Sequence, residues 1–172
     1  MIEVVISRLG MDPSTQSYVV VLQEKGGSRL LPIWIGQAEA DAIVVHIQGI
    51  AHPRPMTHDL CSNIIIAAGS TLRRVQITRV KDNTYYGELH LERDGLPTIV
   101  DSRPSDAIAV AIRLDAPIFA AESLLMVAND EAEEEAAEPV VPSEAPVSDD
   151  SADRLKEYLE HLRPEDFGKF NL

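Results

Sequence analysis

The chain has 172 residues, enough for one domain with a hydrophobic core and too few for two ordinary domains. Hydrophobic residues make up 45% of the chain and aromatic residues only 5%, so we expect a core of Val, Ile, Leu and Ala. The net charge of −13 is uneven: residues 1–128 hold 14 acidic and 11 basic residues, whereas residues 129–172 hold 14 acidic and 4 basic ones. A nearly neutral domain has no bulk attraction for phosphate, which excludes binding to nucleic acid by net charge alone.

Three features that the sequence lacks bear on the cellular location of the protein. Its apolar runs are far shorter than the ~20 residues needed to cross a bilayer. Its first residues lack the pattern of a signal peptide. A single cysteine excludes an intrachain disulfide and a cysteine-rich zinc site. We therefore expect a cytoplasmic protein with no membrane partner.

The N-terminal part predicts three short strands, over residues 2–9, 17–23 and 29–35, separated by turn residues. Short strands joined by tight turns predict an antiparallel meander. Trp34, the only tryptophan, is expected to pack within the third strand. A role in stacking on nucleic acid bases would instead require an exposed ring beside basic groups.

The hydrophobic period then changes to that of a helix. Apolar residues three and four apart predict a helix over residues 37–48, which Gly49 ends. A second helix is predicted over residues 58–68, with Thr57 as its N-cap. Pro104 fits the first turn of a third helix with a buried apolar face.

Four more strands are predicted around these helices, over residues 71–80, 84–92, 96–101 and 116–119. The Asp94-Gly95 pair is a strong hairpin signal. Together these elements predict an α+β fold, with a largely antiparallel or mixed sheet and three main helices.

The composition changes behind this domain, which we expect to span residues 1–128. Residues 129–150 are nearly all Asp, Glu, Ala, Pro, Ser and Val, and they predict a disordered acidic linker. Helical spacing returns over residues 151–163, so residues 151–172 are expected to form a short C-terminal helical segment.

Three blocks of sequence stand out: Leu31-Pro-Ile-Trp-Ile-Gly36 with Glu39 and Ala40, Arg54-Pro-Met-Thr-His-Asp-Leu60, and Asp101-Ser-Arg-Pro-Ser-Asp-Ala-Ile-Ala109. In content, order and spacing they resemble the bifunctional nuclease family, and the match covers roughly residues 2–127. The ending Arg163-Pro-Glu-Asp-Phe167 is also similar to that of many members. Many members carry a helical hairpin after the domain, whereas this sequence predicts the acidic linker and one short helix there.

The resemblance implies a nuclease that hydrolyses phosphodiester bonds of DNA and RNA with low specificity. Such chemistry needs an activated nucleophile and a positive group that stabilises charge on phosphorus. The three blocks supply Glu39, His58, Asp59 and Asp106 as candidate catalytic residues. Arg54, Arg103 and Ser105 are candidate phosphate-binding residues. Asp59, Asp101 and Asp106 are candidate ligands for Mg²⁺ or Mn²⁺.

Each of these residues also has a purely structural interpretation. Asp59 and Asp106 fall in the first turns of helices, where carboxylates are common because they complement the helix dipole. The alternative to a nuclease is therefore a non-enzymatic, oligomeric module that binds a ligand or a protein. The nuclease hypothesis predicts single-stranded DNA or RNA as the partner. Both hypotheses predict a homo-oligomer, with a dimer favoured, because short strands with few aromatics leave edges that need cover.

Overall fold

The computed structural model describes residues 1–12 and 17–127, all within one compact unit. The predicted acidic linker and C-terminal helix lie outside these residues. No helix in the described part of the chain is long and apolar enough to span a membrane.

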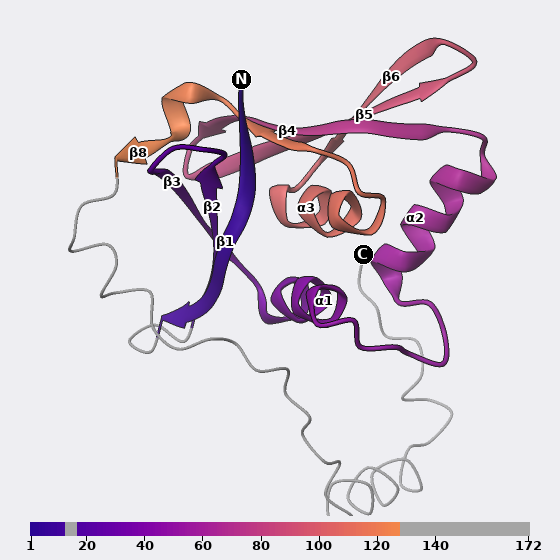
Figure 1. Ribbon diagram of the computed structural model, residues 1–172, viewed down its shortest axis with the longest axis horizontal. Coiled ribbons are helices and arrows are strands. Elements are labelled where there is room, and N and C mark those ends of the chain that lie inside the picture. The colour runs from indigo at the N-terminus through magenta and orange to yellow at the C-terminus, as the bar shows by residue number, and fades with distance from the viewer. Residues whose placement is uncertain (13–16, 128–172) are drawn as a thin grey trace, which may run out of the picture. The chain divides into compact units, whose positions relative to one another are not determined.

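Eight strands form one sheet in the order β6-β5-β4-β7-β1-β2-β3-β8 (Figure 1). The strands are β1 (Ile2–Asp12), β2 (Ser17–Glu24), β3 (Arg29–Ile35), β4 (Thr71–Lys81), β5 (Thr84–Arg93), β6 (Leu96–Ser102), β7 (Ile118–Ala120) and β8 (Met126–Val127). β1, β2 and β3 pair antiparallel, which confirms the predicted meander. Asp94 and Gly95 have φ values of 52° and 78°, as a tight hairpin turn between β5 and β6 requires.

β7 joins the two halves of the sheet. It pairs parallel with β4 on one side and antiparallel with β1 on the other, so the sheet is mixed. It was predicted over residues 116–119, and the strand begins two residues later. Neither β8 nor the 3₁₀ turn over Glu122–Leu124 was predicted, because elements of two or three residues have too few positions to show a period.

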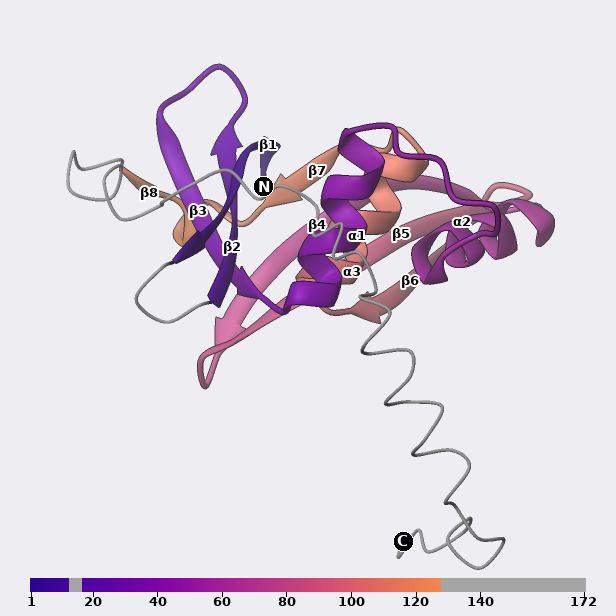
Figure 2. The same ribbon diagram turned by 90° about the horizontal axis from the view of Figure 1, so that it is seen from below.

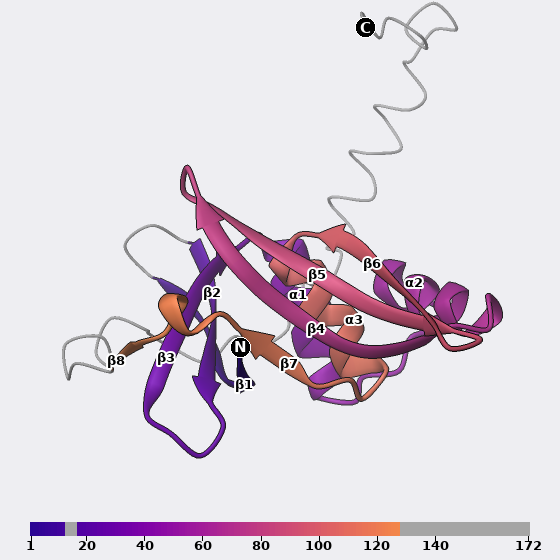
Figure 3. The same cartoon turned by 90° about the horizontal axis from the view of Figure 1, so that it is seen from above.

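Three helices complete the α+β fold: α1 (Gln37–Ile47), α2 (Thr57–Ala67) and α3 (Pro104–Arg113). Seen from below, they lie in front of β4, β5 and β6 (Figure 2). Seen from above, β4, β5 and β6 lie in front and the helices behind, so the helices cover one face of this half of the sheet (Figure 3).

α3 is the central helix, because it packs on β4 and β5 and also contacts α1 and α2. All five residues from Ala107 to Ala111 are buried, and three of them are alanines that let its neighbours approach closely. Ile108 is fully buried and joins a core that includes Ile43 of α1 and Ile77 of β4. The aliphatic core expected from the composition is confirmed.

α2 begins one residue earlier than predicted, so Thr57 is its first residue and Met56 is the N-cap. The Met56 N–H donates to Asp59 Oδ2 at 2.8 Å, which gives one free N–H at the helix start an acceptor. The prediction of Thr57 as N-cap is wrong, because a carboxylate in the first turn caps this helix.

The corner between β6 and α3 depends on a glycine. Gly87 of β5 lies opposite Ser102, and a Cβ on it would come within 3.3 Å of backbone atoms of Pro104. The missing side chain therefore lets the start of α3 lie directly against β5. This contact fixes the position from which Arg103 and Asp106 project.

Candidate active site

Four side chains from the three helices meet at the start of α3. They are Glu39, His58, Arg103 and Asp106, which we call the Arg103 cluster. Glu39, His58 and Asp106 lie in the first turns of their helices, and Arg103 is the N-cap residue of α3. All four are among the predicted site residues, although His58 and Asp106 are 48 positions apart in the sequence.

The bond between Arg103 and Asp106 is bidentate. Arg103 Nε donates to Asp106 Oδ2 at 2.7 Å, and an Arg103 Nη donates to Asp106 Oδ1 at 3.0 Å. The other Nη lies 2.8 Å from Glu39 Oε1, so the guanidinium joins α1 to α3. A guanidinium has five N–H donors, and these three bonds leave two of them for another ligand. The Arg103 side chain is 65% exposed, so a ligand from solvent can reach it.

His58 contacts the same Asp106 oxygen, Oδ1, that accepts the bond from an Arg103 Nη. Its Nε2 is 3.0 Å from Asp106 Oδ1, and its side chain is only 13% exposed. The same carboxylate thus contacts a guanidinium and an imidazole. A carboxylate bonded to one imidazole nitrogen orients the ring and leaves the other nitrogen for proton transfer.

The charges of the cluster stabilise one another. Partial burial raises the pKa of Asp106, but the bonds from Arg103 and His58 outweigh that effect and lower its pKa overall. Hydrogen bonds to Asp106 and the charge of Glu39 raise the pKa of Arg103. Asp106 is therefore a carboxylate and Arg103 a cation at neutral pH.

A pocket of about 390 Å³ lies beside the cluster, and we call it the Trp34 pocket. It is lined by Ser17, Ile33, Trp34, Ile35, Gly36, Glu39, Asn83, Thr84, Tyr85, Arg103, Pro104 and Ser105. Its lining includes the predicted residue Ser105, which is 6% exposed. The first hydrogen bond at the start of α3 runs from the Ala107 N–H to the Arg103 carbonyl. The N–H groups of Ser105 and Asp106 therefore have no acceptor within the helix. Such groups bind anions readily.

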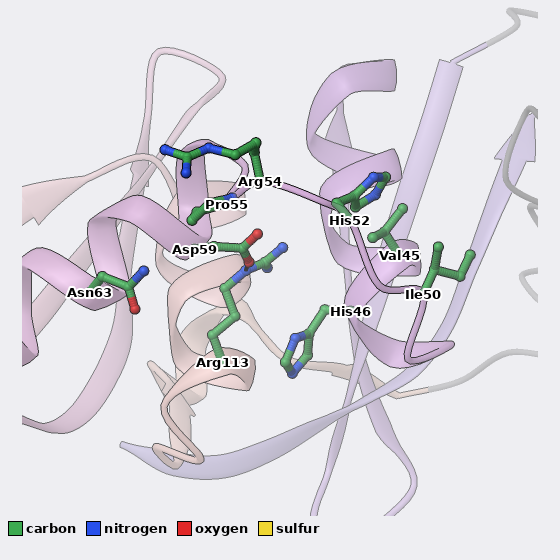
Figure 4. Close-up of a pocket in the computed structure, with 9 residues that line it drawn as sticks. All are labelled: Val45, His46, Ile50, His52, Arg54, Pro55, Asp59, Asn63 and Arg113. Atoms are coloured by element: carbon green, nitrogen blue, oxygen red, sulfur yellow. Dashed lines mark hydrogen bonds and ion pairs between the residues drawn. The ribbon is translucent and has the colours of Figure 1, made fainter.

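Asp59 and Arg54 line a second pocket of about 270 Å³, which we call the Arg113 pocket (Figure 4). Its other lining residues are Val45, His46, Ile50, His52, Pro55, Asn63 and Arg113. Asp59 faces Arg113, and Arg54 extends away from that pair (Figure 4). The hydrogen bond from Arg113, followed by that from the Met56 N–H, lowers the pKa of Asp59. His58 and Asp59 are neighbours in sequence but belong to different sites.

Asp101 lies apart from both groups, on β6 opposite Glu88. Its side chain is exposed and forms no hydrogen bond or ion pair within the described part of the chain. No three His, Cys, Asp or Glu side chains among the described residues lie close enough together to share a metal ion. Asp59 and Asp106 are each paired with a guanidinium instead. The described residues therefore do not form a ready three-ligand site, and metal binding stays a prediction.

The structure shows features of two residues, Arg113 and Trp34, that the sequence did not predict. Arg113 is 5% exposed and bonds Asp59, the Ala109 carbonyl at 2.8 Å and the Ala42 carbonyl at 3.0 Å, so it connects all three helices. A basic residue in the last turn of a helix was the only signal for it in the sequence. Trp34 was expected to pack within its strand, but it is 58% exposed.

An α+β domain with an Arg–Asp–His cluster beside a pocket has the groups that acid–base chemistry on an anionic ligand requires. The family model of the bifunctional nuclease domain matches residues 20–133, and the chain belongs to this family. It is 40% identical to an uncharacterized protein of Mycobacterium tuberculosis (strain ATCC 25618 / H37Rv), over 87% of each chain.

Plant relatives carry the name of the family. The chain is 31% identical to bifunctional nuclease 1 of Oryza sativa subsp. indica, over 62% of this chain and 33% of the rice protein. It is 29% identical to bifunctional nuclease 2 of Arabidopsis thaliana, over 59% of this chain and 32% of that protein. The similarity thus covers about a third of each of these plant proteins.

Proposed function

We propose that the protein is a nuclease that hydrolyses phosphodiester bonds of DNA and RNA, with the Arg103 cluster as its active site. The observation that carries this proposal is the Asp106 carboxylate, which binds both a bidentate guanidinium and an imidazole in a domain of a nuclease family. Arg103 is fixed by its bonds to Asp106 and Glu39 and still has free donors, so it can bind a phosphate without rearrangement.

In this mechanism Arg103 and the N–H groups of Ser105 and Asp106 bind the phosphate oxygens. They stabilise the charge that accumulates as the nucleophile attacks phosphorus. Asp106 orients His58 through Nε2, and His58 Nδ1 accepts the proton of the attacking hydroxyl or water as its oxygen bonds to phosphorus. The P–O bond to the leaving oxygen breaks, and that oxygen takes up a proton from solvent. Glu39 keeps the guanidinium in place. Asp59, Asp101 and Arg54 have no role in this step.

A divalent metal remains part of the proposal. Mg²⁺ is usually held by one or two carboxylates together with substrate phosphates, so a dedicated three-ligand site is not required. We expect purified protein to cleave single-stranded DNA and RNA with Mg²⁺ or Mn²⁺, and to stop when EDTA is added. Cleavage that persists in EDTA would contradict the role of the metal alone. No cleavage under any condition would contradict the nuclease and favour the binding module.

We also propose that the protein forms a homodimer through α2 and β6. Both elements expose large hydrophobic side chains, which are Met56, Leu60, Ile64 and Ile66 near or on α2, and Leu96, Ile99 and Val100 on β6. β6 is also an edge strand of the sheet, with one side unpaired among the described residues. Two copies of β6 can pair antiparallel about a twofold axis, which satisfies both edges at once.

A charge placed in this surface tests the dimer. We expect Ile64→Glu, at a side chain that is 57% exposed, to produce a monomer in sedimentation equilibrium, because the carboxylate would be buried without a partner. Gln48→Glu adds the same charge at the exposed end of α1 and should leave the mass unchanged. A wild-type protein that sediments as a monomer would contradict the dimer.

A further inference from the structure

Trp34 is the only tryptophan of the chain, and more than half of its surface faces solvent. It lies near the end of β3, opposite Val19 of β2. On the other side of β3, β8 pairs only with Arg29 and Leu30. Among the described residues, the edge of β3 beside Trp34 is therefore open, and the core does not explain the ring.

The surroundings of Trp34 are those of a ligand site. It lines the Trp34 pocket together with Tyr85, so two aromatic residues share this pocket. Arg103, Glu39 and Ser105 line it as well, so the pocket is continuous with the proposed active site. Its volume, about 390 Å³, falls in the range of small-molecule sites and is sufficient for one nucleotide.

We propose that Trp34 is a stacking platform for an unpaired base of the strand whose phosphate binds Arg103. This inference rests on the proposed nuclease function and names its substrate more narrowly, as single-stranded nucleic acid. An aromatic ring beside a guanidinium matches a nucleotide, since the ring contacts the base and the guanidinium contacts the phosphate. A base in a duplex is already stacked and paired, so a double strand cannot use the platform without opening.

Stacking is tolerant of sequence, because every base has a π-face. The platform therefore accounts for low sequence specificity in DNA and RNA alike. Tyr85 lines the same pocket from β5 and packs against the hydrophobic core, so it forms a fixed part of the pocket wall.

Because Trp34 is the only tryptophan, intrinsic fluorescence reports on this one ring. The full chain is titrated in EDTA, where binding is measured without cleavage, with three probes of equal length: oligodeoxythymidylate, an abasic oligonucleotide and a blunt duplex. We expect only the strand with unpaired bases to quench the fluorescence strongly. Equal quenching by the abasic strand, or none by oligodeoxythymidylate, would overturn the inference.

Two variants distinguish the contribution of the aromatic face of Trp34 from that of its apolar volume. Trp34→Phe keeps an aromatic face, and Trp34→Leu keeps an apolar side chain without one. In fluorescence anisotropy with labelled oligodeoxythymidylate, we expect the leucine variant to bind about tenfold more weakly and the phenylalanine variant to keep most of the affinity. The salt dependence should not change, because the phosphate contacts remain. Equal affinity of the leucine variant and the wild type would contradict the platform, provided that their melting temperatures agree.

These binding measurements, together with the cleavage assay and sedimentation, distinguish this inference from the nuclease proposal. If stacking fails and cleavage persists, Trp34 has no part in binding and the nuclease stands. If quenching and the ring dependence hold in a protein that cuts nothing, the platform stands and the nuclease does not. If Trp34→Leu instead lowers the sedimentation mass, the ring lies between two copies of the chain and the inference is wrong.

Discussion

Replacing Asp106 with asparagine is expected to slow the cleavage of single-stranded DNA and RNA at least about 100-fold. The amide would be neutral, so it would pair less strongly with Arg103 and could present an N–H where Arg103 and His58 need an acceptor. Both the orientation of the imidazole and the position of the guanidinium would be lost together. The initial rate of cleavage of a labelled oligonucleotide measures this effect.

Asp101 provides a matched control. Asp101→Asn makes the same chemical change five residues earlier, at an exposed position on β6 outside the Arg103 cluster. We expect its rate to stay close to that of the wild type, although the sequence alone made Asp101 a candidate metal ligand. The reverse result, with a slow Asp101→Asn protein and an active Asp106→Asn protein, would move the active site away from the cluster.

His58→Gln should slow cleavage to a similar extent as Asp106→Asn, because in the proposed mechanism the two bonded residues act as a unit. The double variant should then be little slower than either single one, since effects within one catalytic unit are not additive. If the rate reductions of the two single variants multiply in the double variant, His58 and Asp106 act independently, which contradicts the proposed roles.

The second large effect concerns stability. Arg113→Met is expected to destabilise the domain by about 3 kcal/mol, because it breaks a largely buried ion pair and removes the side-chain donor from two backbone carbonyls. We choose the lower end of the range for buried pairs because the Asp59 side chain is 35% exposed and can be hydrated. For a chain of this length the melting temperature should fall by roughly 6–12 °C in calorimetry.

Arg93→Met is the control for Arg113→Met. Its guanidinium is 64% exposed and lies 3.6 Å from an exposed Asp94 carboxylate, so its loss should cost less than about 0.5 kcal/mol. Equal melting temperatures of the two variants would show that Arg113 contributes no more than a surface residue. Arg113→Lys should lie between them, because an ammonium keeps the charge but cannot reach three acceptors in one plane.

Much of the fold followed from local signals. Asp94-Gly95 set a hairpin, Pro104 began a helix, and alternating apolar residues marked the longer strands, all within a few neighbouring positions. The insertion of β7 between β4 and β1 depends on pairing between distant segments, which no local period contains. For the same reason, the open edge of β3 that exposes Trp34 was not predictable, since it depends on how far β8 extends.

The candidate site followed only in part. The residue types in the three blocks indicated His58, Arg103 and Asp106, but the sequence could not place the second and third blocks together. It could not separate Asp59 from His58 either, because the direction of each side chain depends on how α2 crosses α3. Arg113 was missed because its partners are a carboxylate 54 positions away and a carbonyl 71 positions away.

The weak burial of α2 affects how much of the time the Arg103 cluster is complete. Only Ser62 of this helix is buried, so α2 is the least anchored of the three helices. Two adjacent residues of α2 pair with side chains of α3. His58 contacts Asp106 in the first turn of α3, and Asp59 contacts Arg113 in its last turn. A local opening that releases α2 while the sheet stays folded would therefore remove His58 from the cluster. The proposed general base and the residue that pairs α2 with Arg113 belong to the same helical turn.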